Sequence, residues 1–542
     1  NLGYDNVRTI SMSSDQDFYN AMFYAGNFSG KYRIVAGSGY STLNLNGYKL
    51  NVPSTVTEIT GITTIQNGNL SNASIEKFDT NTLTIDSCGI VGDGQSAILG
   101  ESSSKFSKVV IKNSRLIANR AGGMLLDTID SAIDLTLNDS AIFVEADNVD
   151  LVAGNATEAA NGYKITIRNV EIYGKPMRDI VYDNKADGGI YVDTILGGKM
   201  MNNIINNNTA NVTLDLKNMG LNGSVVARNG GNVTLTSSGL DSDGAMFGEN
   251  TKNISLVLSE TDKLTKAVAD TNSGEITITG SNSIIESKIV TTNKAGGKIT
   301  VTLTDSVIKS PLVESNAGEL EITLNGTKGS EISANLVNSN TGKITVNLTN
   351  TKLNGSIATT NAVNGQINFV MSGGANGTPA VDNNAGSVNV ELENATINSN
   401  LFNTNTGTIN WNKLSGNTIK NYLIDTQNST AIMIMKLDSG NTISHSLIRT
   451  ANSNTTFELT SAVVTTYLVE SNNKIMTITA TNCSNLRNLV NVNNAGATIS
   501  LTATNCTITQ MISASNAGVL SVNITGGTLD RLAVTNAATG SI

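Results

Sequence analysis

Few side chains in this 542-residue chain have the types and spacing that catalysis requires. The only histidine, His445, has no acidic residue in the segment around it. General acid or base catalysis needs paired groups within reach of one substrate atom, so we interpret His445 as a solvated strand or corner residue. The carboxylates are dispersed along the sequence. We therefore predict that the protein is not an enzyme and that it uses no cofactor.

Metal and phosphate sites are also not predicted. Asp241-Ser242-Asp243-Gly244 begins like a calcium-binding loop, but the third Asp or Asn and the distant Glu of such loops are missing. We interpret this segment as a surface turn. The glycine-containing segments are not followed by Lys and Ser or Thr at the start of a helix, so none resembles a phosphate-binding loop.

Two groups of residues are candidates for binding or assembly. The first is the densest charged segment, which we expect to be a loop among inserted loops. The second is an aromatic segment near the N-terminus, where covering one end of the fold is the alternative role. Their members are Arg178, Asp179, Tyr182 and Asp183 in the first group, and Phe18, Tyr19, Phe23 and Tyr24 in the second.

The three cysteines share one position of a repeating pattern. Cys483 and Cys506 each follow Ala-Thr-Asn, and Cys88 stands at the place that Ser306 and Thr351 occupy in other repeats. One interpretation is a buried corner position that accepts only small side chains, where Cys packs as a small apolar residue. The alternative is a disulfide between Cys483 and Cys506, for which parallel Cβ directions give poor geometry.

A short phrase of the form Thr/Ser-Asn-x-Gly recurs about every 22 residues in the second half of the chain. A period of this size indicates a solenoid. Stacked asparagine amides can hydrogen-bond to one another along such a structure, so we predict a structural ladder. Its predicted members are Asn272, Asn293, Asn316, Asn340, Asn361, Asn384, Asn405, Asn494 and Asn516.

The residues that follow the phrase alternate between apolar and polar. Lys298 to Leu303 and Lys343 to Leu348 share the pattern Lys-Ile-Thr-Val-x-Leu, which is typical of short strands with one buried face. A leucine-rich repeat would need its own consensus and a helical return, neither of which is present. The sequence predicts an all-β fold, a right-handed parallel β-helix with three strands per coil.

We divide the chain into three regions. Residues 1–53 form a cap with a short helix that begins at the capping box Ser14 to Asp17. Residues 54–270 form irregular coils with inserted loops, and residues 271–542 form regular coils. The last coil has no matching cap, so we expect either a longer natural chain or head-to-tail association in which residues 1–53 of one copy meet residues near Leu529 to Ile542 of the next.

The composition excludes two classes of partner. The net charge is −9, whereas a nucleic-acid-binding protein needs a basic surface. No run of 18 apolar residues is present, so no transmembrane helix is predicted. Charged residues make up 15% of the chain, against about 25% in ordinary domains. Asn, Thr, Ser and Gly replace them, and neutral side chains can stack without repulsion.

The Asn/Thr/Gly-rich coils, the Ile-x-Val-x-Leu strands and the acidic balance resemble the passenger regions of bacterial autotransporters and two-partner-secreted adhesins. This resemblance implies a secreted bacterial protein at the cell surface or outside the cell, with an adhesive or structural role. Its partners would be a host or cell-surface glycan, a protein, or further copies of the chain. The alternatives are a phage tail-spike-like glycan-binding protein and a polysaccharide lyase or hydrolase, which share the β-helix fold.

Overall fold

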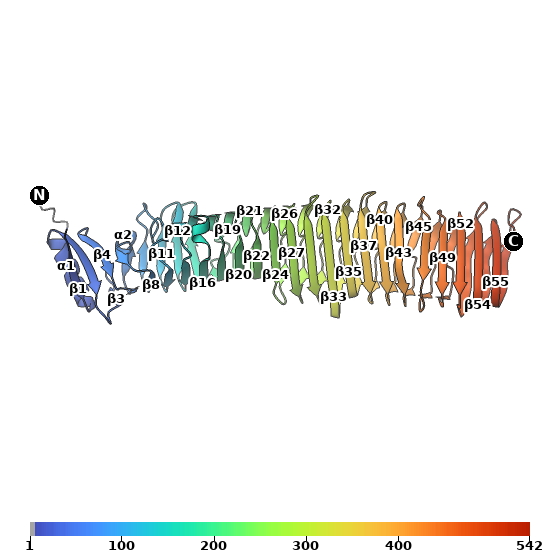
Figure 1. Ribbon diagram of the computed structural model, residues 1–542, viewed down its shortest axis with the longest axis horizontal. Coiled ribbons are helices and arrows are strands. Elements are labelled where there is room, and N and C mark those ends of the chain that lie inside the picture. Colours follow the sequence, from blue (N-terminus) through green and yellow to red (C-terminus); the bar gives the residue numbers. More distant parts are fainter. Residues whose placement is uncertain (1–5) are drawn as a thin grey trace. The chain divides into compact units, whose positions relative to one another are not determined.

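The computed structural model describes residues 6–542 and shows a parallel β-solenoid (Figure 1). The chain forms about 24 turns of about 22 residues each, which confirms the predicted fold class. Two compact units make up the chain, residues 1–257 and 258–542. Each is described separately below.

In the first unit, the strands of successive turns stack in parallel on three sides of the coil. The first side contains β3 Thr42–Asn44, β5 Thr64–Gln66, β8 Thr82–Asp86, β10 Lys108–Lys112, β13 Asp134–Asn138, β16 Tyr163–Gly174, β18 Gly188–Leu196, β20 Val212–Leu221, β22 Val233–Ser242 and β24 Asn253–Leu258. The second contains β6 Asn69–Ser71, β9 Gly89–Val91, β11 Arg115–Ala118 and β14 Ala141–Val144, and the later long strands continue onto it. The third contains β12 Gly122–Ile129, β15 Val149–Asn155, β17 Met177–Asn184, β19 Met201–Asn208, β21 Val226–Asn229 and β23 Phe247–Asn250.

The second unit repeats this arrangement with greater regularity. Its first side contains β27 Glu275–Ser281, β30 Lys298–Thr304, β33 Glu319–Ile332, β35 Lys343–Leu353, β37 Gln366–Ser372, β40 Ser387–Glu393, β43 Thr408–Ser415, β46 Met433–Leu437, β49 Thr455–Thr460, β52 Ile475–Thr481, β54 Thr498–Asn516 and β55 Val519–Asn536. The second contains β25 Lys263–Leu264, β28 Ile284–Ile285, β31 Val307–Ile308, β38 Ala375–Asn376, β41 Thr396–Ile397, β44 Thr418–Ile419, β47 Thr442–Ile443 and β50 Val463–Val464. The third contains β26 Ala269–Asn272, β29 Val290–Asn293, β32 Val313–Asn316, β34 Val337–Asn340, β36 Ala358–Asn361, β39 Val381–Asn384, β42 Phe402–Asn405, β45 Ile424–Gln427, β48 Ile448–Ala451, β51 Val469–Asn472 and β53 Asn485–Asn493.

A small parallel sheet and a helix stand at the N-terminal end of the first unit (Figure 1). The sheet has the order β1-β2-β4-β7, with β1 Val7–Met12, β2 Lys31–Ala36, β4 Val56–Thr60 and β7 Phe78–Asp79. The helix α1 Asp15–Asn27 begins at Ser14, whose side chain accepts a hydrogen bond from the Asp17 backbone N–H, as the capping box predicts. Two shorter helical segments are α2 Asn72–Ile75 and a 3₁₀ turn at Glu158–Ala160.

A ladder of buried asparagines runs inside the solenoid at the end of the third side. In the second unit, Asn272 Nδ2 donates to Asn293 Oδ1 at 3.0 Å, and the steps from Asn293 to Asn405 measure 2.7 to 2.8 Å. Each of these amides also donates to a backbone carbonyl of its own corner, as Asn316 does to Gly318. A buried polar group without partners is costly, and the stack supplies the partners.

The ladder has two features that the repeat phrase did not predict. It is also present in the irregular first unit, through Asn155, Asn184, Asn208, Asn229 and Asn250. In the second unit it reaches Gln427 and is interrupted at the next coil, where Ala451 occupies the position and the Ser453 hydroxyl meets Gln427 at 3.4 Å.

One predicted member of the ladder is wrong. Asn493, and not Asn494, accepts from Asn472 at 2.9 Å and donates to Asn516 at 2.8 Å. Asn494 lies one residue outside the core, where its amide reaches Asn473. The corner after Asn493 is longer than most, with Ala497 N–H donating to the carbonyl of Asn494. This extra length moved the repeat phrase out of register by one residue.

The glycine of the repeat phrase is explained by close stacking of the corners. A Cβ atom on Gly342 would lie 2.2 Å from the carbonyl oxygen of Gly318 one coil earlier, and a Cβ on Gly407 would lie 2.1 Å from that of Gly386. No side chain can occupy this space, so the corner backbones approach each other directly. The glycine therefore preserves the strand spacing.

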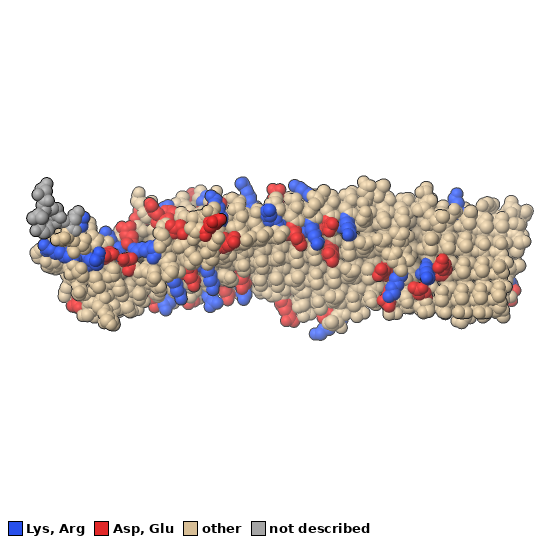
Figure 2. Space-filling model, viewed as in Figure 1, with Lys and Arg blue, Asp and Glu red and all other residues tan. Residues whose placement is uncertain are grey.

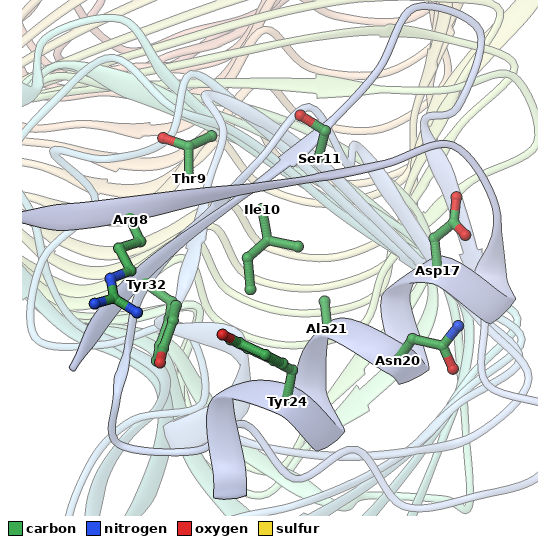
Figure 3. Close-up of a pocket in the computed structure, with 9 residues that line it drawn as sticks. All are labelled: Arg8, Thr9, Ile10, Ser11, Asp17, Asn20, Ala21, Tyr24 and Tyr32. Atoms are coloured by element: carbon green, nitrogen blue, oxygen red, sulfur yellow. The ribbon is translucent and has the colours of Figure 1, made fainter. Parts of the chain in front are cut away.

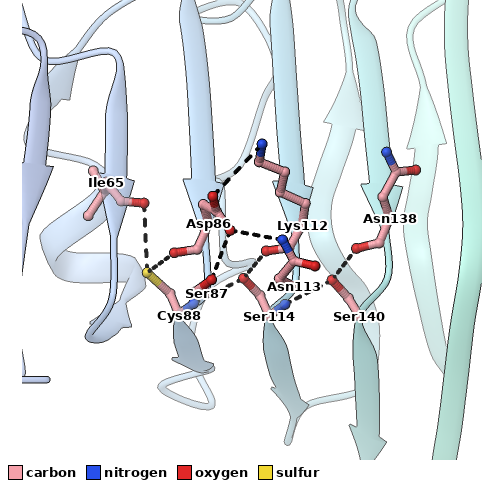
Figure 4. A network of polar contacts seen from close by, with 9 residues as sticks. All are labelled: Ile65, Asp86, Ser87, Cys88, Lys112, Asn113, Ser114, Asn138 and Ser140. Carbon is pink, nitrogen blue, oxygen red and sulfur yellow. Dashed lines mark hydrogen bonds and ion pairs between the residues drawn. The ribbon is translucent and has the colours of Figure 1, made fainter.

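A second internal ladder lies at the corner between the first and second sides (Figure 4). In each coil a left-handed residue, such as Ser87 with φ 55° or Asn113 with φ 52°, turns the chain, which explains why Asn and Asp are common there. The next side chain points inward. The Ser114 hydroxyl donates to the Lys112 carbonyl at 2.8 Å and accepts from the Cys88 backbone N–H at 3.2 Å.

The predicted slot residues all occupy this corner. The structure buries Cys88, Ser306, Thr351, Cys483 and Cys506, with at most 3% of any of them exposed. The Cys506 sulfur accepts from the Cys483 backbone N–H at 3.4 Å, and the cysteines are unbonded thiols. The alternative of a Cys483–Cys506 disulfide is therefore wrong. Burial raises the pKa of the Cys483 thiol to about 11.

We predict that Asn384→Ala destabilises the second unit. Asn384 accepts from Asn361 at 2.8 Å and donates to Asn405 at 2.7 Å, so its loss leaves a buried amide oxygen without its donor. The free energy of unfolding should fall by roughly 1–3 kcal/mol. Urea unfolding followed by the fluorescence of Trp411, the only tryptophan, measures this effect.

The matched control is Asn389→Ala in the outer ladder of Asn368, Asn389 and Asn410, which is accessible to water. Because water can replace the lost partners there, the change should be less than about 0.5 kcal/mol. Equal destabilisation by the two variants would contradict an internal ladder that stabilises the fold.

Candidate functional sites

The predicted aromatic residues of α1 differ in exposure: Phe18 is buried, Tyr19 is half-buried, and Phe23 and Tyr24 are exposed. Phe18 is fully buried, because it lies on the helix face of Ala21, Met22 and Ala25. The Tyr19 hydroxyl donates to the backbone carbonyl of Asn44 in β3 at 2.9 Å. The prediction of Phe18 as a binding residue is therefore wrong, and Tyr19 joins the helix to the first coil.

Tyr24 borders a hollow between α1 and β1 (Figure 3). Phe23 is 72% exposed, and the ring of Tyr24 stacks on Phe28 with centroids 4.5 Å apart. Tyr24 lines the hollow together with Arg8 and Tyr32 at one end and Asp17 at the other. The volume is about 500 Å³. A hollow of this size with aromatic walls and charged ends can hold a polar ligand with an apolar part.

The charged segment around Arg178 lies on a strand, so the prediction of a loop is wrong. Residues Met177–Asn184 form β17, which pairs with β15 and β19 on the third side of the coil. Met177, Ile180 and Val181 are buried, and these apolar residues anchor the strand. The density of charge concealed the strand pattern.

Arg178 lies between a carboxylate and an aromatic ring. Its Nε and Nη2 atoms donate to the two oxygens of Asp150 at 3.0 and 2.6 Å, and its Cζ atom lies 3.9 Å from the centroid of the Tyr182 ring. Asp150 was not among the predicted residues. It lies 28 residues before Arg178, a spacing of one coil in the irregular half, so the repeat period was the signal that could have found it.

Asp150 and Asp179 are stacked and fully buried. The register that pairs Val152 with Val181 aligns them on neighbouring strands. Neither oxygen of Asp179 accepts a hydrogen bond, and Arg178 Nε lies 3.7 Å away. Burial raises the pKa of Asp179 to about 7, and the nearby Asp150 adds to the rise. Burial also raises the pKa of Asp150, although hydrogen bonds from Arg178 oppose it.

The outer part of this cluster is neutralised within the chain. Asp183 lies 3.2 Å from Lys185 Nζ and accepts from Asn207 Nδ2 at 3.3 Å. Tyr182 is 37% exposed and covers Arg178. The predicted group Arg178, Asp179, Tyr182 and Asp183 is thus brought together on one strand. Its buried part is a pair of stacked carboxyl groups beside Arg178.

The single histidine has partners that the sequence did not indicate. The rings of Tyr422 and His445 meet edge-on with their centroids 4.5 Å apart. The Tyr422 hydroxyl donates a hydrogen bond to the Glu470 carboxylate at 2.5 Å. Burial raises the pKa of that hydroxyl. Arg449 binds Asp425 through two nitrogens beside them. Tyr422, His445 and Glu470 are close because each lies about one coil from the next. A phenol, an imidazole and a carboxylate in contact can transfer protons.

The turn at Asp241 and Asp243 is occupied by a lysine of the chain itself. Lys199 Nζ lies 3.2 Å from Asp241 and also contacts Asp243. Within residues 6–542, no group of three or more His, Cys, Asp or Glu side chains is placed to hold a metal ion. No helix in this range is long and apolar enough to cross a membrane.

Comparisons with known proteins do not identify a family. No family model, no curated protein sequence and no solved structure matches the chain.

We predict that Asp179 makes the first unit less stable as the pH rises. In the unfolded chain the carboxyl loses its proton near pH 4, whereas in the folded chain it keeps the proton until about pH 7. Folding then favours the protonated form, so stability declines between these two values and stays low above them. Asp179→Asn should remove most of this decline and add roughly 1–3 kcal/mol at pH 8.

Thermal unfolding followed by circular dichroism at pH 5 and pH 8 measures this effect. The matched control is Asp183→Asn on the same strand, where the carboxylate is partly exposed and paired with Lys185. It should leave the pH dependence unchanged. If the pH dependence of stability is the same in Asp179→Asn and in the unsubstituted protein, then Asp179 is not the cause of that dependence.

Proposed function

We propose that the protein is a non-enzymatic, secreted bacterial surface protein whose solenoid serves adhesion and structure. One observation carries this proposal, namely that the repeated residues are used inside the fold. The asparagines, the corner residues and the glycines of the repeat form internal ladders and close contacts. The repeats therefore build a long surface, and they do not form a reaction centre.

The surface itself supports the same proposal. In the second unit, broad areas of the visible face carry no charged side chains, and the charges that are present occur in small clusters of both signs (Figure 2). Lys288 with Glu314 and Arg449 with Asp425 are examples of ion pairs in this unit. Neutral Thr, Asn and Ser side chains can hydrogen-bond to glycans or proteins without a strong field. The resemblance to autotransporter and two-partner-secreted adhesins agrees with this surface.

A polysaccharide lyase or hydrolase is the second candidate, and the cluster of Tyr422, His445 and Glu470 favours it. These three side chains combine a phenol, an imidazole and a carboxylate within contact distance. Glu470 accepts the hydrogen bond of the Tyr422 hydroxyl, and this bond would have to break before that proton could be transferred to a substrate.

We predict binding to surface polysaccharides without turnover. The purified protein would be incubated with immobilised glycans of bacterial and of host origin, both acidic and neutral. Two quantities would be measured in the same experiment: the amount of protein retained, and the amount of newly formed reducing ends or unsaturated products. Retention without product is the expected result. Product formation that is lost in His445→Ala would overturn the proposal in favour of an enzyme. Lys436→Gln, a substitution in the same unit, is the control and should not change product formation.

We also propose that copies of the chain associate head to tail through residues 1–53 and residues near Leu529 to Ile542. Strand β1 is an edge strand of its sheet, and edge strands can pair with other chains. Phe23 and Phe28 beside it are 72% and 53% exposed. In the second unit, Val534 is 56% exposed. Apolar surface at both regions would be buried on association.

We predict that Phe23→Ser combined with Phe28→Ser weakens this association by at least about tenfold, because two exposed aromatic side chains are lost from the interface. Sedimentation velocity over a range of concentrations measures it. Ile432→Ser combined with Ile434→Ser is the control, since these residues are 64% and 55% exposed on the side of the second unit. An unsubstituted protein that stays monomeric at every concentration would contradict head-to-tail association.

A further inference from the structure

Three neighbouring strands of the first unit enclose a hollow of about 150 Å³ that none of the predicted sites includes. It lies on the outer face of β16, β18 and β20, and its charged and aromatic lining consists of Lys164, Arg168, Tyr191, Asp193, Asp215 and Lys217. The register fixes their arrangement. Thr166, Tyr191 and Asp215 form one column across the strands, and Arg168, Asp193 and Lys217 form the adjacent column.

Gly189 allows the aromatic ring to lie against the sheet. A Cβ atom at Gly189 would lie 2.7 Å from Tyr191 Cε2 and 2.9 Å from its hydroxyl oxygen, so the ring occupies the space of the missing side chain. Lys164 Nζ lies 5.1 Å from the ring centroid. The tyrosine is therefore held in place by its own strand and by the neighbouring lysine. A ring fixed beside a hollow offers an apolar face on which a sugar ring can stack.

The charged side chains around the hollow do not form ion pairs with one another. Three cations, Lys164, Arg168 and Lys217, stand beside two carboxylates, yet within residues 6–542 none of the five forms an ion pair. Some charged side chains elsewhere in the same unit do pair, as Arg178 does with Asp150 and Lys199 with Asp243. The chain as a whole has a net charge of −9, whereas three of the five charged side chains that line this hollow are cations.

Asp215 adds a second, independent indication of a ligand. Its Oδ1 atom is buried and accepts no hydrogen bond from the chain. A buried oxygen without a donor is unusual in folded proteins. Asp215 lines the hollow, so a hydroxyl group bound there would donate to its accessible carboxylate oxygen next to the Tyr191 ring, since the two residues are register partners.

We propose that this face binds an acidic saccharide, a polymer whose sugar units carry carboxylates. Arg168 and Lys217 bind the carboxylate, Asp215 accepts from a ring hydroxyl, and Tyr191 stacks on the sugar face. The hollow is smaller than the roughly 300–1,000 Å³ of typical small-molecule pockets, so it takes about one sugar unit, and the neighbouring units extend over the adjacent coils. This inference rests on the proposed adhesive function and names its ligand class.

Calorimetric titration of the full chain with trigalacturonic acid tests the site. Its methyl ester and maltotriose are the uncharged controls. We expect binding of the acid only, and a loss of at least about tenfold in affinity for Arg168→Gln combined with Lys217→Gln, because each removed cation takes a charge-assisted hydrogen bond with it. Lys352→Gln combined with Lys436→Gln changes the net charge equally at exposed positions of the second unit, and it should leave the affinity unchanged.

Asp215→Ala separates a defined site from general attraction between opposite charges. This variant makes the face more positive, so general attraction would strengthen the binding of the acid. A site in which Asp215 accepts from a sugar hydroxyl requires weaker binding, by several-fold or more. Tyr191→Ala should weaken binding of the acid as well.

Three results would overturn the inference: no binding of trigalacturonic acid, equal binding of its methyl ester, or tighter binding by Asp215→Ala. They would leave the proposed adhesive function standing, because retention on other glycans is measured separately. Cleavage of the saccharide would instead overturn the proposed non-enzymatic function and leave the site in place.

Discussion

Parallel stacking of strands at one fixed spacing is the constraint on which the rest of this structure depends. Backbone hydrogen bonds hold adjacent strands about 4.8 Å apart, and each side chain therefore lies directly against its counterpart in the next coil. At that spacing, a buried amide can bond to the amide stacked on it in the next coil, and two facing glycine corners leave no room for Cβ atoms. Composition, corner chemistry and core packing all follow from this one distance.

The same constraint explains how far the sequence could predict the fold. A period near 22 residues and the alternation in segments such as Lys343 to Leu348 were sufficient for the parallel β-solenoid, because every coil repeats the same requirement. Register at long corners was less predictable. The additional residues after Asn493 placed the repeat phrase on Asn494, since a phrase of four residues does not reveal how many residues a corner contains.

The candidate sites were harder to predict than the fold. Asp150 meets Arg178, and Glu470 meets Tyr422, because stacked coils bring together residues that are one or two periods apart. In the irregular unit the coil length varies, so no single offset identifies such partners. Tyr191 and Asp215 illustrate the same difficulty, since neither residue is distinctive in the sequence and the space between them depends on the absence of a side chain at Gly189.

The interruption of the asparagine ladder at Ala451 has a mechanical consequence. On either side of this coil, the amides join successive turns through direct side-chain hydrogen bonds, whereas Ala451 contributes none, and the Ser453 hydroxyl replaces it by accepting from Gln427 at 3.4 Å and donating to the Ser429 carbonyl at 2.6 Å. When the solenoid is stretched along its stacking direction, load passes through every coil in series, and the connection with the fewest bonds separates first. A single alanine thus marks the coil at which we expect the solenoid to open first under such a load.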